Sequence, residues 1–130
     1  MATGIVVTTV LPHATPAAWS SHSSARGYYD FIAQQQMEAQ PPFDLLFGGG
    51  ARYFDSRRAD GRDLIIEHSA TYIVVANASA LENEILRSAK RQNPLLGLFA
   101  DDDMDYEVDR VRRPAADRQP SLREVRTSLE

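Results

Sequence analysis

The stretch GIVVTTV, residues 4–10, is apolar or β-branched at almost every position. This composition is typical of a strand buried on both faces of a parallel sheet. The strand leads into LPHATP, residues 11–16, where a threonine followed by a proline indicates the start of a helix near Pro16. A strand that passes through a short turn into a helix is the repeating unit of an α/β fold.

Further apolar runs alternate with helical patterns along the rest of the chain. Strands are predicted at residues 43–47, 72–75 and 95–99, and helices at 28–39, 63–68, 80–90 and from 122 to Glu130. Ser79 as N-cap and Glu82 as its capping-box partner predict the start of the third of these helices. The alternation predicts an α/β fold with a mainly parallel sheet flanked by helices, in a strand order that one sequence does not determine.

Length and composition predict a single globular domain over residues 1–130. Fourteen Lys and Arg against 18 Asp and Glu give a net charge of −4, which argues against a nucleic-acid-binding protein. The sequence contains no run of about 18 apolar residues, so no membrane span is predicted. The start MATGIVVTTV lacks the basic residues that open a signal peptide. The absence of cysteine excludes disulfides and thiolate catalysis, and three histidines (His13, His22 and His68) argue against an all-histidine metal site.

Apolar residues recur along the last predicted helix up to the end of the sequence. Leu122, Val125 and Leu129 fall on one helical face. A helix of this kind without a C-cap is expected in a piece cut from a larger protein, and equally at a natural C-terminus that frays. The helix alone leaves both interpretations open.

The turn after the first strand is the first candidate site, because α/β proteins place ligands at the carboxyl ends of parallel strands. Thr15 before Pro16 has the pattern of an N-cap, which accounts for it structurally. Its hydroxyl also suits a hard cation such as Mg²⁺. His13 either orients a metal-bound water or lies on the surface.

Two other motifs are assigned no ligand. Acidic residues gather at positions 101–103, 105, 107 and 109, without the spacing and mid-loop glycine of an EF-hand, and predict a solvent-exposed loop. The glycines at 48–50 are not followed by the Lys-Ser or Lys-Thr of a P-loop, so they predict a turn that ends the second strand.

Several blocks together carry a resemblance to a known family. They are TGIVVTT (3–9), HATPAA (13–18) with His22 and Arg26, FGGGARYF (47–54), LLGLFA (95–100), MDYEVDR (104–110) and PSL (120–122) with Glu124. In this order, over almost the whole chain, the set resembles the central part of an alkaline phosphatase. The resemblance implies an alkaline-phosphatase-like α/β domain of which residues 1–130 form one portion.

The resemblance implies a metal-dependent phosphomonoesterase, in which a serine attacks phosphorus and Zn²⁺ and Mg²⁺ ions assemble the site. Thr15 matches the family's Mg²⁺-ligating threonine, and His13 matches a position beside that site where members carry Asp or His. Arg26 matches the arginine that holds the phosphoryl oxygens, a role that suits its planar fork of donors. Without the resemblance, Arg26 would be interpreted as an exposed cation near a helix end.

Spacing sets a condition on this site. Arg26 follows Thr15 by eleven residues, which would span roughly 16 Å along a straight helix. A compact site therefore requires a short helix and a break, for which the polar stretch SSHSS at 20–24 and Gly27 are suited.

Other parts of the family's site have no counterpart in the sequence. No Asp-Ser-Ala nucleophile motif and no downstream zinc-ligand segment occurs, and His68 has no partner at metal-ligand spacing. The chain is therefore predicted to be a segment of an enzyme that hydrolyses phosphate monoesters, with parts of the Mg²⁺ and phosphate subsites and no activity alone. The family implies a periplasmic or secreted homodimer. The alternatives are a non-catalytic binding or assembly module of the same fold and a complete small enzyme with a rearranged site.

Overall fold

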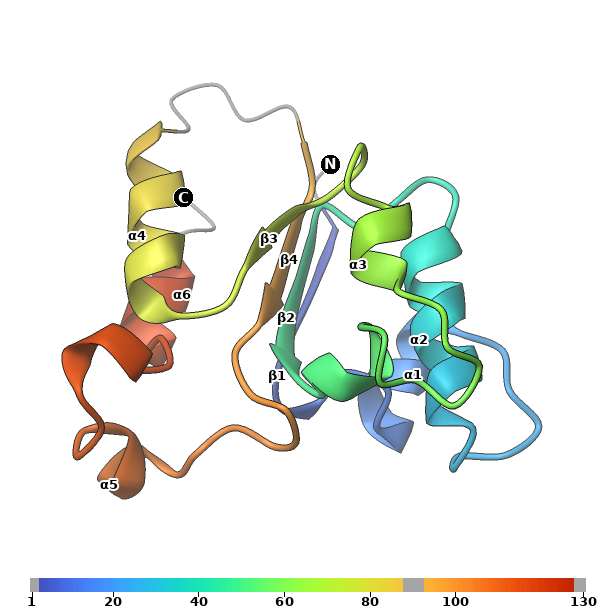
Figure 1. The fold of residues 1–130 in the computed structure, drawn as a ribbon, viewed down its shortest axis with the longest axis horizontal. Coiled ribbons are helices and arrows are strands. Elements are labelled where there is room, and N and C mark those ends of the chain that lie inside the picture. The colour runs from blue at the N-terminus through green and yellow to red at the C-terminus, as the bar shows by residue number, and fades with distance from the viewer. Residues whose placement is uncertain (1–2, 88–92, 128–130) are drawn as a thin grey trace.

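The computed structural model of the protein describes residues 3–87 and 93–127. Within them, parallel strands form one sheet in the order β1-β2-β4-β3 (Figure 1). The strands are β1 Gly4–Val10, β2 Leu45–Gly49, β3 Ile73–Val75 and β4 Leu95–Leu98. The predicted α/β class and the parallel sheet are confirmed.

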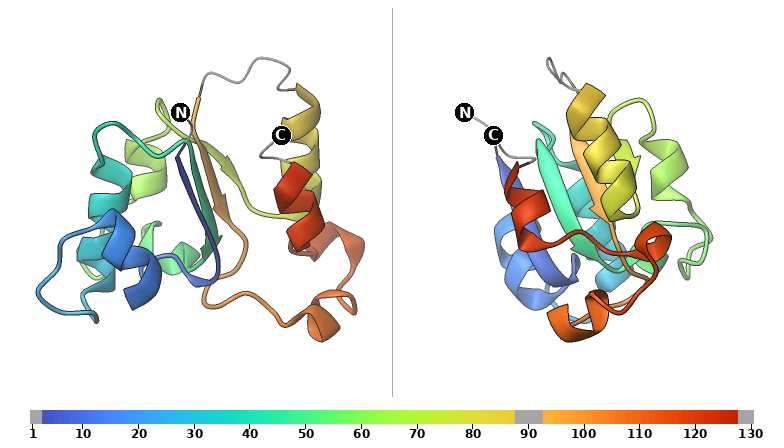
Figure 2. Two further views of the ribbon diagram at one scale, coloured as in Figure 1. Left: turned by 180° about the vertical axis from the view of Figure 1, so that it is seen from behind. Right: turned by 90° about the vertical axis from the view of Figure 1, so that its left-hand side faces the viewer.

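Helices cover both faces of this sheet. They are α1 Ala14–Ser20, α2 Tyr29–Glu38, α3 Leu64–Glu67, α4 Ala78–Arg87, α5 Glu107–Arg110 and α6 Leu122–Thr127, with short 3₁₀ turns η1 Ala51–Tyr53 and η2 Ala115–Asp117. Figure 2 shows α1, α2 and α3 on one side of the sheet and α4 and α6 on the other. The predicted ends of α4 and α6, at residues 88–90 and 128–130, lie outside the described residues.

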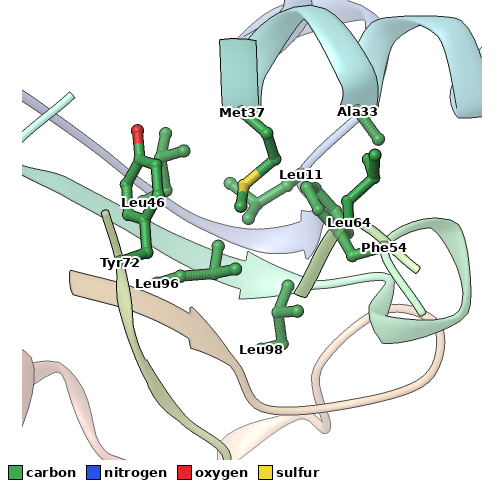
Figure 3. Close-up of a cluster of buried hydrophobic side chains, with 9 residues drawn as sticks. All are labelled: Leu11, Ala33, Met37, Leu46, Phe54, Leu64, Tyr72, Leu96 and Leu98. Carbon is green, nitrogen blue, oxygen red and sulfur yellow. The ribbon is translucent and has the colours of Figure 1, made fainter. Parts of the chain in front are cut away.

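The alternation of side chains along β2 and β4 divides the core between the two faces. One cluster lies under α2 and α3 and comprises Leu11, Ala33, Met37, Leu46, Phe54, Leu64, Tyr72, Leu96 and Leu98 (Figure 3). The other faces α4 and α6 and comprises Leu45, Phe47, Val75, Leu81, Leu95, Phe99 and Val125. Both central strands are buried along their whole length.

The expectation that residues 4–10 are buried on both faces is wrong. β1 lies at the edge of the sheet, with β2 on one side, and its residues alternate between exposed and half-buried as far as Val10. Val6 is 40% exposed. The apolar composition of β1 is therefore not explained by burial within the part of the chain that the structure describes.

The predicted end of the second strand is also wrong, because β2 continues through the first two glycines. A Cβ atom at Gly49 would lie 1.9 Å from the carbonyl oxygen of Asp102, so the close approach of the 101–103 segment requires glycine there. Gly50 then adopts a φ of +89° and turns the chain into η1. The three glycines admit a neighbouring backbone as well as forming the predicted turn.

Both predicted N-caps are displaced by two residues. Asn77, not Ser79, caps α4, and its Oδ1 accepts the Ala80 N–H at 2.8 Å. At α1 the N-cap position is His13, whose side chain makes no capping hydrogen bond, and Thr15 lies inside the first turn. The cap interpretation of Thr15 is therefore wrong. At α6 a capping box does form, between Ser121 and Glu124.

Replacing the observed cap of α4 should destabilise the fold. Asn77→Ala removes an acceptor of a first-turn N–H, so we expect a loss of about 1 kcal/mol in the free energy of unfolding. Ser79→Ala is the matched control, because Ser79 is exposed in the first turn of the same helix. Urea denaturation of the two variants measures both changes. A larger loss for Ser79→Ala would contradict the assignment.

Candidate functional site

His13 and Thr15 are placed by the turn that joins β1 to α1. The Leu11 N–H donates to the Gly49 carbonyl at 3.0 Å, and the His13 N–H donates to the Val10 carbonyl at 3.0 Å. Helix α1 starts at Ala14, with its first bond from Ala17 N–H to the His13 carbonyl at 2.9 Å. These bonds set both candidate side chains at the carboxyl end of β1.

His13 and Thr15 line one open hollow beside the edge strand. The other lining residues are Val6, Val7, Thr8, Thr9 and Pro16. Thr15 is exposed and His13 is half-buried, so both residues of this hollow are accessible to solvent. The structure thus brings together two of the three predicted site residues.

Arg26 does not line that hollow. It is exposed in the loop between α1 and α2, and it makes no ion pair with the residues that the structure describes. The chain does break as the spacing required: α1 ends at Ser20 after seven residues. The His22 N–H then donates to Oε1 of Gln35 on α2 at 2.6 Å, which holds the start of the loop on that helix.

Gln36 braces the helix that carries Thr15, and sequence reasoning did not identify it. Its side chain is fully buried. Its Nε2 donates to the Leu11 carbonyl at 3.0 Å and to the Ser20 Oγ at 2.9 Å, which lie before and at the end of α1. The available signal was a glutamine on the buried stripe of α2, beside Ile32, Ala33 and Met37.

The acidic segment at 101–103 is exposed, as predicted, but it is also bonded to the carboxyl end of the sheet. Asp103 Oδ1 accepts the Val10 N–H at 2.8 Å, and the Asp102 carbonyl accepts the Gly50 N–H at 3.0 Å. The hydrogen bond from the Arg57 guanidinium, at 2.6 Å, lowers the pKa of Asp101 below its ordinary value. The segment is therefore held against the carboxyl ends of β1 and β2 by these two hydrogen bonds.

The donors near the hollow do not form a complete metal site. Among the described residues, no three His, Asp or Glu side chains gather in a group that could hold a metal ion. The Thr15 hydroxyl fits one position of the oxygen shell that Mg²⁺ prefers. Zn²⁺ finds no ligand set in the described part of the chain.

No helix within the described residues combines the length and the apolar character needed to cross a bilayer.

The fold and site define an α/β unit with polar groups at the carboxyl end of its edge strand, the usual position of ligand sites in parallel sheets. The family model for alkaline phosphatase matches residues 1–128. The repressible alkaline phosphatase of Saccharomyces cerevisiae is 37% identical over 94% of this chain. The crystal structure of Thermus thermophilus alkaline phosphatase superposes with a TM-score of 0.79, at 36% identity over 98% of the chain. The alkaline phosphatase of the Antarctic bacterium TAB5 gives a TM-score of 0.68, at 28% identity over 81%.

The chain belongs to the alkaline phosphatase family. It spans about a quarter of its relatives, 24% of the yeast protein and 26% of the Thermus chain. One solved variant of the TAB5 enzyme has Mg bound in a site called M3. The resemblance drawn from the sequence blocks is confirmed at the level of family and fold.

Removing the brace on α1 should destabilise the protein. Gln36→Leu leaves the buried Leu11 carbonyl without its side-chain donor, and we expect a loss of about 1–3 kcal/mol in the free energy of unfolding. Gln34→Leu, at a half-buried position of the same helix where the amide bonds only the Glu38 carboxylate, should stay within about 0.5 kcal/mol of the parent chain. Thermal and urea unfolding measure both. Equal losses would show that Gln36 does not act through these bonds.

Proposed function

We propose that this chain is a segment of an enzyme that hydrolyses phosphate monoesters through a phosphoserine, and that it supplies part of the Mg²⁺ and phosphate subsites. One observation carries the proposal: His13 and Thr15 line a single hollow at the carboxyl end of β1, within a family match that spans residues 1–128. The resemblance also implies a periplasmic or secreted protein and a homodimer, and we extend the proposal to both.

Each residue has a role that its chemistry permits. Thr15 would hold Mg²⁺ through its hydroxyl, together with oxygen ligands from outside this chain. His13 would lie beside the ion as a neutral imidazole. Arg26 would donate two parallel hydrogen bonds to phosphoryl oxygens, and its charge would offset the charge on those oxygens during transfer. When bound, the metal ions would supply electrostatic stabilisation of the transferred group.

The isolated chain should be inactive, because it contains neither the nucleophile motif nor a zinc-ligand set. With Zn²⁺ and Mg²⁺ added, the purified chain should hydrolyse an aryl phosphate no faster than a blank that contains the metals alone. A spectrophotometric assay of the released phenolate measures this rate. Metal-dependent turnover that disappears in Arg26→Ala would instead support a complete small enzyme.

A chimera tests the assigned residues in an active context. In this protein, called the Thermus chimera below, residues 1–130 replace the matched segment of Thermus thermophilus alkaline phosphatase. Arg26→Ala and Arg26→Lys should both lose about 1.5–3 kcal/mol of transition-state stabilisation, roughly tenfold to hundredfold in kcat/KM, because an ammonium cannot reproduce the fork. Arg87→Ala is the control, since Arg87 is exposed on α4. If neither change at Arg26 affects kcat/KM, Arg26 is a surface cation.

Thr15 and His13 should control the response of the Thermus chimera to Mg²⁺. Thr15→Asn moves the oxygen, and near-octahedral geometry tolerates little displacement, so activation by Mg²⁺ should require a higher concentration. His13→Asp adds a carboxylate and should tighten Mg²⁺ binding. It also places a favoured N-cap before α1, so the melting temperature should rise.

The measurement is a Mg²⁺ titration of activity alongside melting curves. Because Thr15 caps nothing in α1, Thr15→Asn should shift the titration with little change in the melting temperature. If Thr15→Asn leaves the Mg²⁺ concentration needed for activation unchanged, Thr15 does not coordinate the metal ion.

A further inference from the structure

We propose that Arg58 is a positioning residue for Arg26, because its buried guanidinium joins the helix that follows Arg26 to the segment that follows β2. The proposal rests on the proposed function, in which Arg26 holds phosphoryl oxygens. Its evidence is separate: the turn that contains Arg26, and the hydrogen bonds and burial of Arg58.

Arg26 lies in a turn that is continuous with α2. The Tyr28 N–H donates to the Ala25 carbonyl at 3.3 Å, which closes a four-residue turn around Arg26 and Gly27. The Tyr28 carbonyl then accepts the Ile32 N–H at 2.9 Å, at the start of α2. The backbone of Arg26 therefore moves with the first turn of α2.

The guanidinium of Arg58 joins that first turn to η1. Its Nη1 donates to the Asp30 carbonyl on α2 at 2.9 Å and to the Tyr53 carbonyl in η1 at 2.7 Å. Another hydrogen bond runs from the Ala59 N–H to Oδ2 of Asp30 at 3.0 Å. Asp30 is therefore held through both its carbonyl and its carboxylate by the segment that carries Arg58.

A pair of aromatic rings adds a contact between the same two segments. The ring centroids of Tyr29 and Tyr53 lie 5.1 Å apart with an interplanar angle of 83°, the edge-to-face arrangement that aromatic pairs favour. At the other end of the loop, the His22 N–H donates to Oε1 of Gln35 on α2. Both ends of the loop that carries Arg26 are thus fixed on α2, and the segment from Tyr53 to Ala59 fixes the start of α2.

Arg58 is buried although it carries a charge. Its side chain is 1% exposed, and its Nε and Nη2 donate to the Asp60 carboxylate at 3.0 Å and 2.6 Å. Apolar residues in place of a buried ion pair often leave a protein equally stable or more stable, so stability is a weak explanation for an arginine here. The planar fork supplies donors in fixed directions to several acceptors at once. The arrangement therefore favours a role in holding α2 at one position against η1.

Arg57 provides a matched control for Arg58. Its side chain is 51% exposed and pairs with Asp55 and Asp101. None of its side-chain hydrogen bonds within the described residues reaches α2. A change to lysine at either position keeps the charge and removes the fork, so the two variants differ in which contacts are lost.

Amide hydrogen exchange in the isolated chain tests whether Arg58 holds the start of α2. Relative to the amides of β2, which report global unfolding, Arg58→Lys should speed exchange of the Ala59 and Ile32 amides by at least about fivefold. Arg57→Lys should leave both rates within about twofold of the parent chain. Unchanged exchange in Arg58→Lys, or equal acceleration in the two variants, would overturn the proposal.

A double-mutant cycle in the Thermus chimera tests whether Arg58 acts through Arg26. Arg58→Lys should lower kcat/KM for an aryl phosphate about tenfold when Arg26 is present, and less than about twofold in the Arg26→Ala background. Arg57→Lys should stay within about twofold of the parent in both backgrounds. If Arg58→Lys lowers kcat/KM by the same factor in both backgrounds, its role is structural only and the proposal is wrong.

Two substitutions at Asp30 keep the proposal testable if the Arg58→Lys chimera does not fold. Asp30→Ala removes the acceptor of the Ala59 N–H, whereas Asp30→Asn keeps an oxygen acceptor there. With Arg26 present, Asp30→Ala should lower kcat/KM about threefold or more, and Asp30→Asn should stay within about twofold of the parent. Equal kcat/KM values for the two variants would overturn the proposal.

Two outcomes distinguish this proposal from the proposed function. Faster exchange at Ala59 and Ile32 in Arg58→Lys, with a Thermus chimera that hydrolyses no phosphate monoester, would keep the hold of Arg58 on the Arg26 turn and remove the function. Hydrolysis that falls in Arg26→Ala but not in Arg58→Lys would remove the positioning role and keep the function.

Discussion

The hydrogen bonds that join the carboxyl ends of β1 and β2 determine where the candidate site lies. The Leu11 N–H bonds to the Gly49 carbonyl, and the 101–104 segment adds bonds to Thr8 and Val10. The approach of that segment depends on Gly49, where a Cβ atom would collide with the Asp102 carbonyl. Together these contacts fix the point at which β1 ends and α1 begins, and so the positions of His13 and Thr15.

The parts of the fold that depend on local pattern could be predicted from the sequence. The strand at 4–10 was predicted at its observed bounds, and the helix at 28–39 is α2 within one residue at each end. The sequence does not determine which of two nearby residues caps α4, because Asn77 and Ser79 are both good N-caps. The exposure of β1 could not be predicted, because the burial of a strand depends on which strands lie beside it.

The site could be predicted in part, through the resemblance more than through physical pattern. His13 and Thr15 share a hollow, whereas Arg26 stands in an exposed loop and its role remains a prediction. The hydrogen bonds made by Gln36, Asp102 and Asp103 join residues that are far apart in the chain. Single-sequence periodicity carries no information about such contacts. The chain spans about a quarter of its relatives, and under the proposed function the oxygen ligands missing from the described residues come from outside this chain.

The most direct measurement of this account is a crystal structure of the Thermus chimera with Mg²⁺ and inorganic phosphate bound. The account predicts that the Thr15 Oγ1 coordinates the Mg²⁺ ion and that the Arg26 guanidinium bonds to two phosphate oxygens. A structure in which phosphate binds other cations, with Thr15 away from the metal, would contradict it.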